Sequence, residues 1–144
     1  MRYLAIDYGT KRTGLAICDP AETICSPMTV IVGNKELLTR IIDIIEAESV
    51  EAVVLGLPLN MDGTEGPQSR LVHEFAGRLK KTISIPVYFQ DERLSSFGAE
   101  EKLVAADLTR AGKKKRIDAV AAAEILEAFL EQKNSAGETD TTSL

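Results

Sequence analysis

The sequence has few of the residues that build disulfide frameworks or zinc sites. It contains two cysteines and one histidine among 144 residues, which excludes a disulfide scaffold and a zinc-finger ligand set. No apolar run approaches the roughly 20 residues that cross a bilayer. A carboxylate at Asp7 interrupts the first apolar segment too early for a signal peptide. These absences predict a cytoplasmic protein that does not contact a membrane.

Basic residues are also in the minority. The chain has 17 Lys and Arg against 22 Asp and Glu, a net charge of -5. This excludes a basic coat over the whole surface but not a local basic patch. With 44% hydrophobic and 27% charged residues, the composition is typical of one globular domain. We expect the domain to span residues 1–133 and the polar segment 134–144 to be a disordered tail.

The apolar pattern predicts an α/β fold. Three short apolar segments, at 3–6, 13–18 and 28–32, are too closely spaced for crossover helices, which predicts an antiparallel meander. Apolar strands at 52–57 and 86–90 then alternate with helical patterns, as in parallel strands joined by helices. We therefore expect a mixed five-stranded sheet with helices on both faces. The helices are expected at 35–48, around 71–79, from 95 or 96 to 108, and at 117–132.

Three acidic residues are candidates for one shared site. Asp7 ends the first strand, Glu92 follows the fifth strand, and Asp118 is expected to open the last helix. Singly, each has an ordinary explanation in a turn or a helix terminus. Together they predict an oxygen-ligand site for Mg²⁺ or Mn²⁺. Two such ions about 3.5–4 Å apart can activate a water and stabilise the leaving oxygen of an in-line displacement.

Basic residues lie beside these acids in the sequence. Lys11 and Arg12 are on the turn after Asp7, where they could neutralise a phosphate. Five of the nine residues in 110–118 are basic. Such a run is usually a solvated loop, but cations next to carboxylates are also what a phosphodiester site requires. Gly9 and Gly14 are expected to adopt positive φ and to let the backbone approach a ligand.

Two other features receive no catalytic role. His73 lies on an amphipathic helix, and the chain has no Gly-x-Ser-x-Gly motif. The glycine-rich loop 56–66 lacks the Gly-Lys-Ser/Thr of a Walker-type phosphate loop. Neither feature therefore indicates acyl transfer or nucleoside-triphosphate binding.

Four segments together resemble the YqgF/RuvX family of pre-16S rRNA nucleases, also described as Holliday-junction-resolvase-like proteins. The segments are DYGTKRTGLAICD (7–19), GLPLNMDGTEG (56–66), DERLSS (91–96) and KKKRIDAVAAAEIL (113–126), and the resemblance covers about residues 2–131. It implies a ribonuclease H-like fold and a nuclease that uses divalent metal ions on structured nucleic acid. The role assigned to the family is maturation of the 5′ end of the small-subunit ribosomal RNA during ribosome biogenesis.

The resemblance also implies residue roles. Asp7, Glu92 and Asp118 would be the catalytic and metal-binding acids, with Asp91 as an alternative to Glu92. Resolvases place their second acid at the end of the fourth strand, where this chain has Gly56, and Asp62 and Glu65 lie farther out in the loop. From the charge pattern and the resemblance together, the expected phosphate contacts are Lys11, Arg12, Arg93, Lys113, Lys114, Lys115 and Arg116.

Several functions fit this pattern. A nuclease could process pre-16S rRNA on the small ribosomal subunit as a monomer, or could resolve branched DNA in recombination and repair as a two-fold homodimer. A non-catalytic nucleic-acid-binding factor for ribosome assembly is a second class. The Asp-x-Gly-Thr sequence at 7–10 also resembles the phosphate loop of actin-like ATPases and sugar kinases. Those proteins need two such domains, for which 144 residues leave no room.

Overall fold

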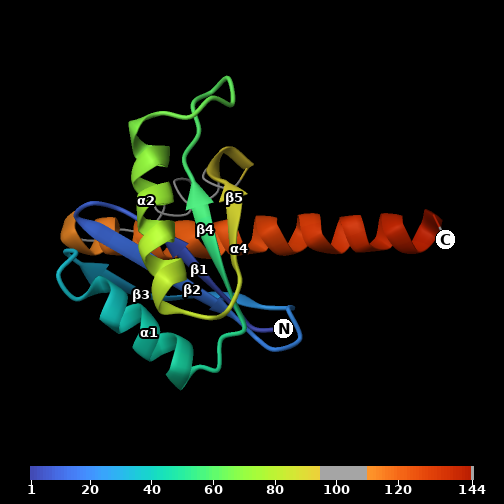
Figure 1. The fold of residues 1–144 in the computed structure, drawn as a ribbon, viewed down its shortest axis with the longest axis horizontal. Helices are drawn as coiled ribbons and strands as arrows, with labels where there is room; N and C mark the ends of the chain where they lie inside the picture. Colours follow the sequence, from blue (N-terminus) through green and yellow to red (C-terminus); the bar gives the residue numbers. More distant parts are fainter. Residues whose placement is uncertain (95–109, 144) are drawn as a thin grey trace.

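The computed structural model describes residues 1–94 and 110–143, and within the last helix it describes the side chains of residues 119–135. Five strands and three longer helices alternate along these residues (Figure 1). The elements are β1 (Tyr3–Asp7), β2 (Arg12–Cys18), β3 (Cys25–Val32), α1 (Leu37–Ala47), β4 (Ala52–Leu57), α2 (Pro67–Thr82), β5 (Val87–Asp91), the 3₁₀ turn η1 (Glu92–Leu94) and α4 (Arg110–Ser143).

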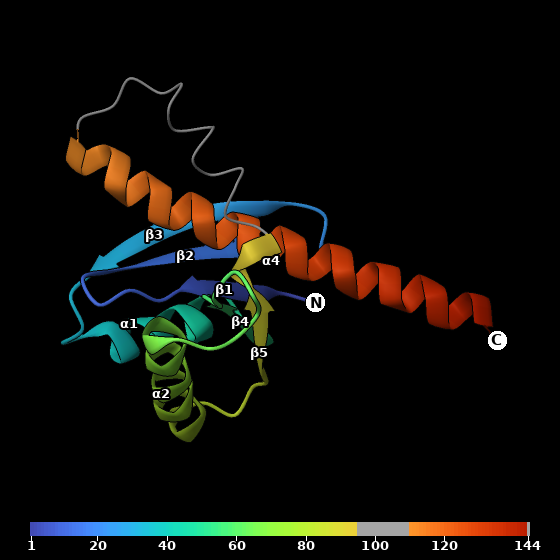
Figure 2. The ribbon, with the colours of Figure 1, turned by 90° about the horizontal axis from the view of Figure 1, so that it is seen from above.

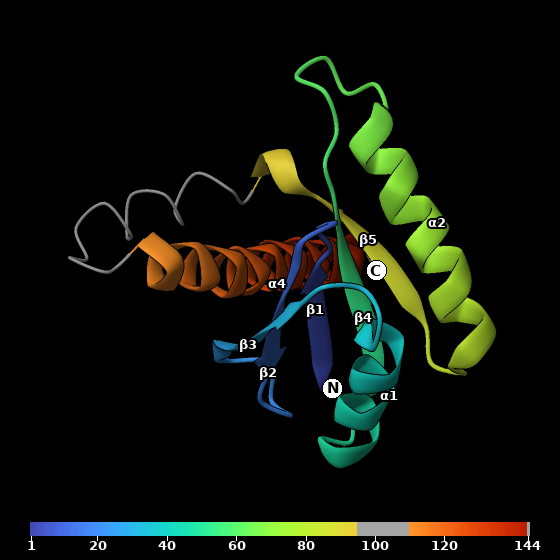
Figure 3. The same cartoon turned by 90° about the vertical axis from the view of Figure 1, so that its left-hand side faces the viewer.

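The strands form one mixed sheet in the order β3-β2-β1-β4-β5. β1, β2 and β3 are antiparallel neighbours, whereas β4 pairs in parallel with both β1 and β5. Helices α1 and α2 cover one face, and α4 crosses the other (Figures 2 and 3). The expected five-stranded α/β sheet, with its first three strands antiparallel and helices on both faces, is confirmed.

Large side chains fill the face under α1 and α2. Leu4 and Ile6 of β1 are fully buried there. Ile41 of α1 and Phe75 and Leu79 of α2 pack into the same cluster. Because successive residues of a strand point to opposite faces, Tyr3, Ala5 and Asp7 belong to the other side. This alternation decides where the acidic end of β1 is presented.

Small side chains dominate the face under α4. Ala5, Ala16 and Ala52 meet Ala122 and Leu126 of the helix in a second buried cluster. Alanine on both surfaces lets the helix axis approach the sheet closely. The buried positions of α4 recur at the spacing of one helical stripe: Ala119, Ala122, Ala123, Leu126 and Leu130.

The last helix is longer than expected at both ends. It begins at Arg110, so the basic run is helical, because Lys and Arg are strong helix formers. Position 118 is therefore inside the helix, and the expectation that Asp118 opens it is wrong. The segment 134–143, expected to be disordered, continues the helix, and Asn134 and Ser135 are exposed. The helix expected at 95–108 lies outside the described residues.

No helix in the described part of the chain is long and apolar enough to cross a membrane.

Cys18 is buried and Cys25 half-buried, and both are free thiols. Burial raises the pKa of both thiols, that of Cys25 to about 12. The expectation of a buried free thiol at Cys18 is confirmed.

Truncation of Leu126 tests the packing of α4. Leu126 is fully buried, so Leu126→Ala should lower the free energy of unfolding by about 2–5 kcal/mol. Leu94→Ala is the matched control, because Leu94 is 59% exposed and its loss should change stability by less than about 0.5 kcal/mol. Urea unfolding measures both. Equal midpoints for the two variants would mean that α4 does not hold this face.

Candidate nuclease site

Asp7 lies at the end of β1 between two glycines. It pairs with Gly14 of β2, and the β1–β4 register, which matches Ile6 with Leu55, brings Gly56 to its other side. The next residue, Tyr8, stacks on Phe75 in the opposite layer with 4.4 Å between ring centroids. That contact and the strand alternation direct Asp7 toward α4. Both glycines are buried, and neither places a side chain beside Asp7.

The Glu92 carboxylate lies over Gly56. A Cβ added to Gly56 would be 2.6 Å from Glu92 Oε1 and 2.6 Å from Ile125 Cδ1 of α4. Gly56 is buried and belongs to the same face as Asp7, and neighbouring strands are about 4.8 Å apart. The carboxylate therefore occupies the space that a side chain at the end of β4 would fill. Glu92 is thus placed at the end of the strand next to β1, and its convergence with Asp7 stays a prediction.

Asp91, the alternative to Glu92, is engaged by Arg93. The guanidinium donates from Nε to both carboxylate oxygens, at 3.1 and 2.9 Å, and from Nη2 to Oδ2 at 2.6 Å. This pairing holds the pKa of Asp91 below its usual value. Asp91 is two residues after Phe89 on β5, so it belongs to the same face of the sheet. Phe89 packs against the cluster under α1 and α2, on the side away from α4. The described geometry thus favours Glu92 over Asp91 as the acid beside Asp7.

Arg93 also fixes the loop after β4. Its Nη1 donates to the carbonyl of Met61 at 3.2 Å, which ties loop 58–66 to the end of β5. With Asp91 and this carbonyl as partners, the guanidinium has a structural role as well as the predicted contact with phosphate. Its side chain is 38% exposed, so a phosphate can still reach it.

The two outer acids of this loop serve the loop itself. Asp62 Oδ1 accepts hydrogen bonds from the amide and the hydroxyl of Thr64, at 3.0 and 2.6 Å, and these bonds lower the pKa of Asp62. Glu65 pairs with His73, whose ring lies 4.9 Å from that of Phe89. These contacts explain His73 without catalysis and make Asp62 and Glu65 poor partners for Asp7.

The predicted phosphate contacts are only partly placed. Lys11 is exposed on the β1–β2 turn and Arg12, half-buried, begins β2 with the same parity as Gly14. Both therefore lie at the edge that carries Asp7. The backbone of 113–118 is helical, but the side chains of Lys113, Lys114, Lys115, Arg116 and Asp118 lie outside the described ones.

Gly9 and Gly14 do not have the backbone conformation that the sequence predicts. Positive φ occurs at Gly33 and Gly63 among the described glycines, so the prediction of positive φ at Gly9 and Gly14 is wrong. A Cβ at Gly9 would overlap the carbonyl oxygen of Arg12. Gly9 is thus needed for close backbone packing within the turn, whereas Gly14 is buried in β2 as the partner of Asp7.

A groove of about 670 Å³ adjoins Glu92. Its walls come from loop 58–66 and from the turn after β5, and they include Leu59, Met61, Arg93 and Leu94. Met61 is 95% exposed and Leu94 59% exposed. The edge of the sheet therefore offers a carboxylate beside an open channel, which suits a polymer better than a small enclosed substrate.

The candidate ligand atoms at this edge are of the type that a hard divalent cation prefers. Asp7 and Glu92 supply carboxylate oxygens, which Mg²⁺ and Mn²⁺ prefer, and two carboxylates on one face favour a positive charge between them. Within the described residues no group of three His, Cys, Asp or Glu side chains forms a complete ligand set. The third expected ligand, Asp118, belongs to the part whose side chains are not described.

Fold and site together define the class of a ribonuclease H-like α/β protein with acids at the carboxyl ends of β1 and β5. The chain matches the RuvX family, described as Holliday junction resolvase, over residues 1–132, and it belongs to that family. It is 41% identical to a protein of Roseiflexus sp. (strain RS-1) over 90% of this chain and 94% of that one. It is 43% identical to a protein of Syntrophomonas wolfei, covering 91% and 94%. Both relatives are named "Putative pre-16S rRNA nuclease".

Solved structures with low sequence identity share the fold. One is T. thermophilus RuvC in complex with a Holliday junction substrate, with a TM-score of 0.61, 16% identity and coverage of 93% of this chain and 96% of that one. Another is the Fowlpox virus resolvase with Holliday junction DNA, with a TM-score of 0.55, 12% identity and coverage of 92% and 98%. The ribonuclease H-like fold expected from the sequence is thereby confirmed.

Reasoning from the sequence missed the role of Gly14 and Gly56. Their signal was available in the strand pattern. Gly14 has the α4-face parity of Ala16, two residues away, and Gly56 has that of Val54 and Ala52, two and four residues away. A glycine at that parity beside an acidic strand end indicates space kept for another group.

Substitution of Gly56 tests this arrangement. Gly56→Ala should lower the free energy of unfolding by about 1–3 kcal/mol, because the new Cβ meets Glu92 and Ile125 at 2.6 Å. Adding Ile125→Val removes the Cδ1 atom and should recover part of the loss. Urea unfolding of the single and double variants measures this coupling.

Gly77→Ala is the matched control for the Gly56 series. Gly77 lies in α2 with no heavy atom within 4 Å of an added Cβ, so alanine should stabilise the helix by about 0.5–1 kcal/mol. If Gly56→Ala is also neutral or stabilising, Glu92 and Ile125 do not press on this site.

Proposed function

We propose that this protein is a divalent-metal-dependent nuclease that hydrolyses phosphodiester bonds in structured RNA. Its substrate would be the 5′ end of pre-16S rRNA, processed in the cytoplasm during ribosome biogenesis. The observation that carries the proposal is that Asp7 and Glu92 belong to the same face of the sheet, with the Glu92 carboxylate over Gly56 at the end of the strand next to β1. The names of the relatives support RNA as the substrate.

Each group at the edge has a distinct task in this proposal. Asp7, Glu92 and Asp118 would hold one or two Mg²⁺ or Mn²⁺ ions, which when bound supply an activated water and stabilise the leaving oxygen. Arg93 keeps loop 58–66 against β5 and so keeps the groove beside Glu92 in shape. Lys11, Arg12 and the run Lys113–Arg116 would neutralise the phosphates that flank the cleaved bond.

RNA is favoured over DNA by the level of similarity. The relatives named for rRNA share 41% and 43% of their residues with this chain, whereas the resolvases bound to DNA share 16% and 12%. The second candidate is a resolvase of branched DNA. The shared fold and the family description support it. That activity would require a homodimer to cut two strands, whereas a processing nuclease can act as a monomer.

Asp7→Asn tests catalysis. The amide keeps the size of the side chain but removes a charged oxygen ligand, so Mn²⁺- or Mg²⁺-dependent cleavage should fall by roughly 100-fold or more, since even groups that only orient ligands cost 10–100-fold. The measurement is single-turnover cleavage of a pre-16S rRNA 5′ fragment, with a four-way DNA junction as the competing substrate. His73→Ala is the control and should cleave at the wild-type rate.

Full activity in highly purified Asp7→Asn protein would rule out the nuclease. Preference for the four-way junction over the rRNA fragment would favour the resolvase. Loss of cleavage with an unchanged unfolding midpoint would support the assignment of Asp7, because the loss then cannot come from unfolding.

Neutralising the basic run separates binding from catalysis. Changing Lys113, Lys114, Lys115 and Arg116 to glutamine preserves helix-forming residues and should weaken RNA binding. The slope of log K against log salt should fall by about one for each phosphate that is no longer neutralised. The control changes Lys80 and Lys81 to glutamine on α2, on the opposite face of the sheet. Equal salt slopes for the two variants would exclude the basic run from the RNA interface.

A non-catalytic nucleic-acid-binding factor would give a different result. Its Asp7→Asn variant would bind RNA as the wild type does, and no variant would cleave RNA.

A further inference from the structure

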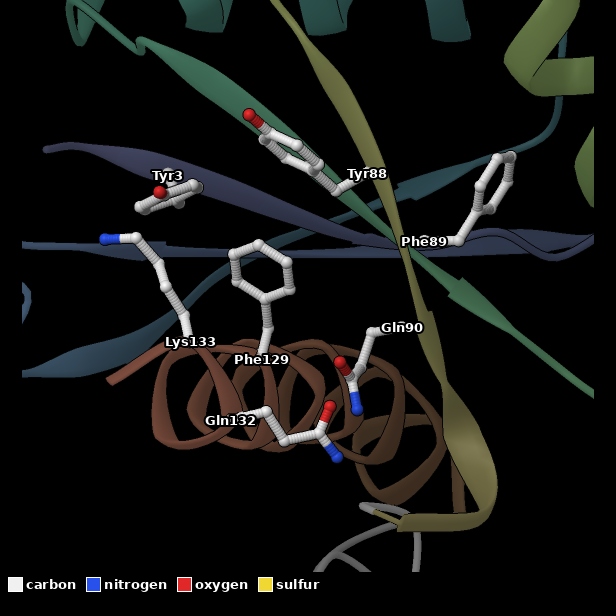
Figure 4. Close-up of a pocket in the computed structure, with 7 residues that line it drawn as sticks. All are labelled: Tyr3, Tyr88, Phe89, Gln90, Phe129, Gln132 and Lys133. Carbon is white, nitrogen blue, oxygen red and sulfur yellow. The ribbon is translucent and has the colours of Figure 1, made fainter. Parts of the chain in front are cut away.

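A cavity of about 420 Å³ lies between β5 and α4, apart from the groove beside Glu92 (Figure 4). Three aromatic rings from three elements form one side of it. Phe129 of α4 lies between Tyr3 of β1 and Tyr88 of β5, with ring centroids 5.3 and 5.5 Å away. Tyr88 is 41% exposed although it stands on this cluster. The cavity therefore has an accessible aromatic wall with a packed base beneath it.

Two amide groups form the other side of the cavity. Gln90 of β5 and Gln132 of α4 both line the cavity (Figure 4). Gln90 is only 4% exposed, and its Nε2 has no hydrogen-bond partner among the described residues. An amide provides donors and an acceptor, and a buried donor without an acceptor is costly. Gln132 is exposed and adds a second amide to the lining of the cavity.

Flat rings beside a buried amide match the chemistry of a nucleobase. Bases stack on aromatic side chains whatever their sequence, and glutamine can pair with the edge of a base through its donor and acceptor together. The volume is within the range of small-molecule sites. Lys133 also lines the cavity, but it forms an ion pair with Glu22 at 2.7 Å, so its charge is already compensated.

The position of the cavity relates it to the nuclease edge. Tyr3, Tyr88 and Gln90 share the α4 face with Asp7, and Gln90 is two residues before Glu92. Tyr3 is four residues before Asp7, which is roughly 13 Å along a strand. We propose that this cavity binds an unpaired nucleobase of the RNA strand whose backbone lies at Asp7 and Glu92. The inference rests on the proposed function and adds that the substrate must contain a single-stranded nucleotide near the cleaved bond.

Tyr88→Ala, compared with Tyr88→Phe, tests the proposal without any cleavage. The full chain is titrated in EDTA with a single-stranded RNA carrying 2-aminopurine and with a fully paired duplex of the same sequence. Tyr88→Ala should weaken single-strand binding roughly 5- to 100-fold and abolish the quenching of 2-aminopurine. Tyr88→Phe should retain both, and duplex binding should not change. Gln90→Leu, which keeps the size of the side chain, should alter the preference among the four bases.

Each other outcome has a defined meaning. Wild-type single-strand affinity in Tyr88→Ala would overturn the proposal. A changed sedimentation coefficient with unchanged RNA binding would also overturn it, and would assign the cavity to a second copy of the chain. Quenching that depends on Tyr88 in a protein without nuclease activity would keep the base site and reject the proposed catalysis. Cleavage that is lost in Asp7→Asn but unchanged in Tyr88→Ala would keep the proposed catalysis and reject the base site.

Discussion

Small side chains on one face of the sheet let α4 pack closely against it, and the rest of the structure depends on this contact. Ala5, Ala16 and Ala52 form the floor, and Ala122 and Leu126 of the helix fit onto it. The opposite face carries leucine, isoleucine and phenylalanine and holds its helices through larger side chains. The same close approach brings Ile125 of α4 to Gly56 and confines Glu92 to the space above that glycine. The core and the candidate site are thus set by one contact.

The end of β4 shows how the family could carry its second acid on a different strand. A side chain at Gly56 would have to share its space with the Glu92 carboxylate, so an acid at position 56 and an acid at position 92 are alternatives. The chain has glycine at the first and glutamate at the second.

The fold was largely predictable from the sequence, but the site was not. The apolar runs and their spacing predicted every described strand. Burial on both faces leaves the clearest pattern in β1 and β4, whereas β3 and β5 are partly exposed. The predicted start of α4 was wrong, because the basic run was interpreted as a loop although its residues favour helix. The nearness of Glu92 to Gly56 depends on the β4–β5 register and on the turn at η1. Neither feature has a local signal, since both follow from tertiary packing.

The net charge of -5 does not exclude RNA binding, because basic residues lie beside the candidate site. Glu22, Glu127 and Glu131 surround a cleft near the β2–β3 turn, where Glu22 also binds the N-terminal amine. That end is opposite to the edge that carries Asp7, because Met1 precedes β1 and Asp7 ends it. Lys11 and Arg12 lie at the Asp7 edge. Basic groups attract phosphate, so in the proposed function Lys11 and Arg12 would favour the approach of a nucleic acid to this edge.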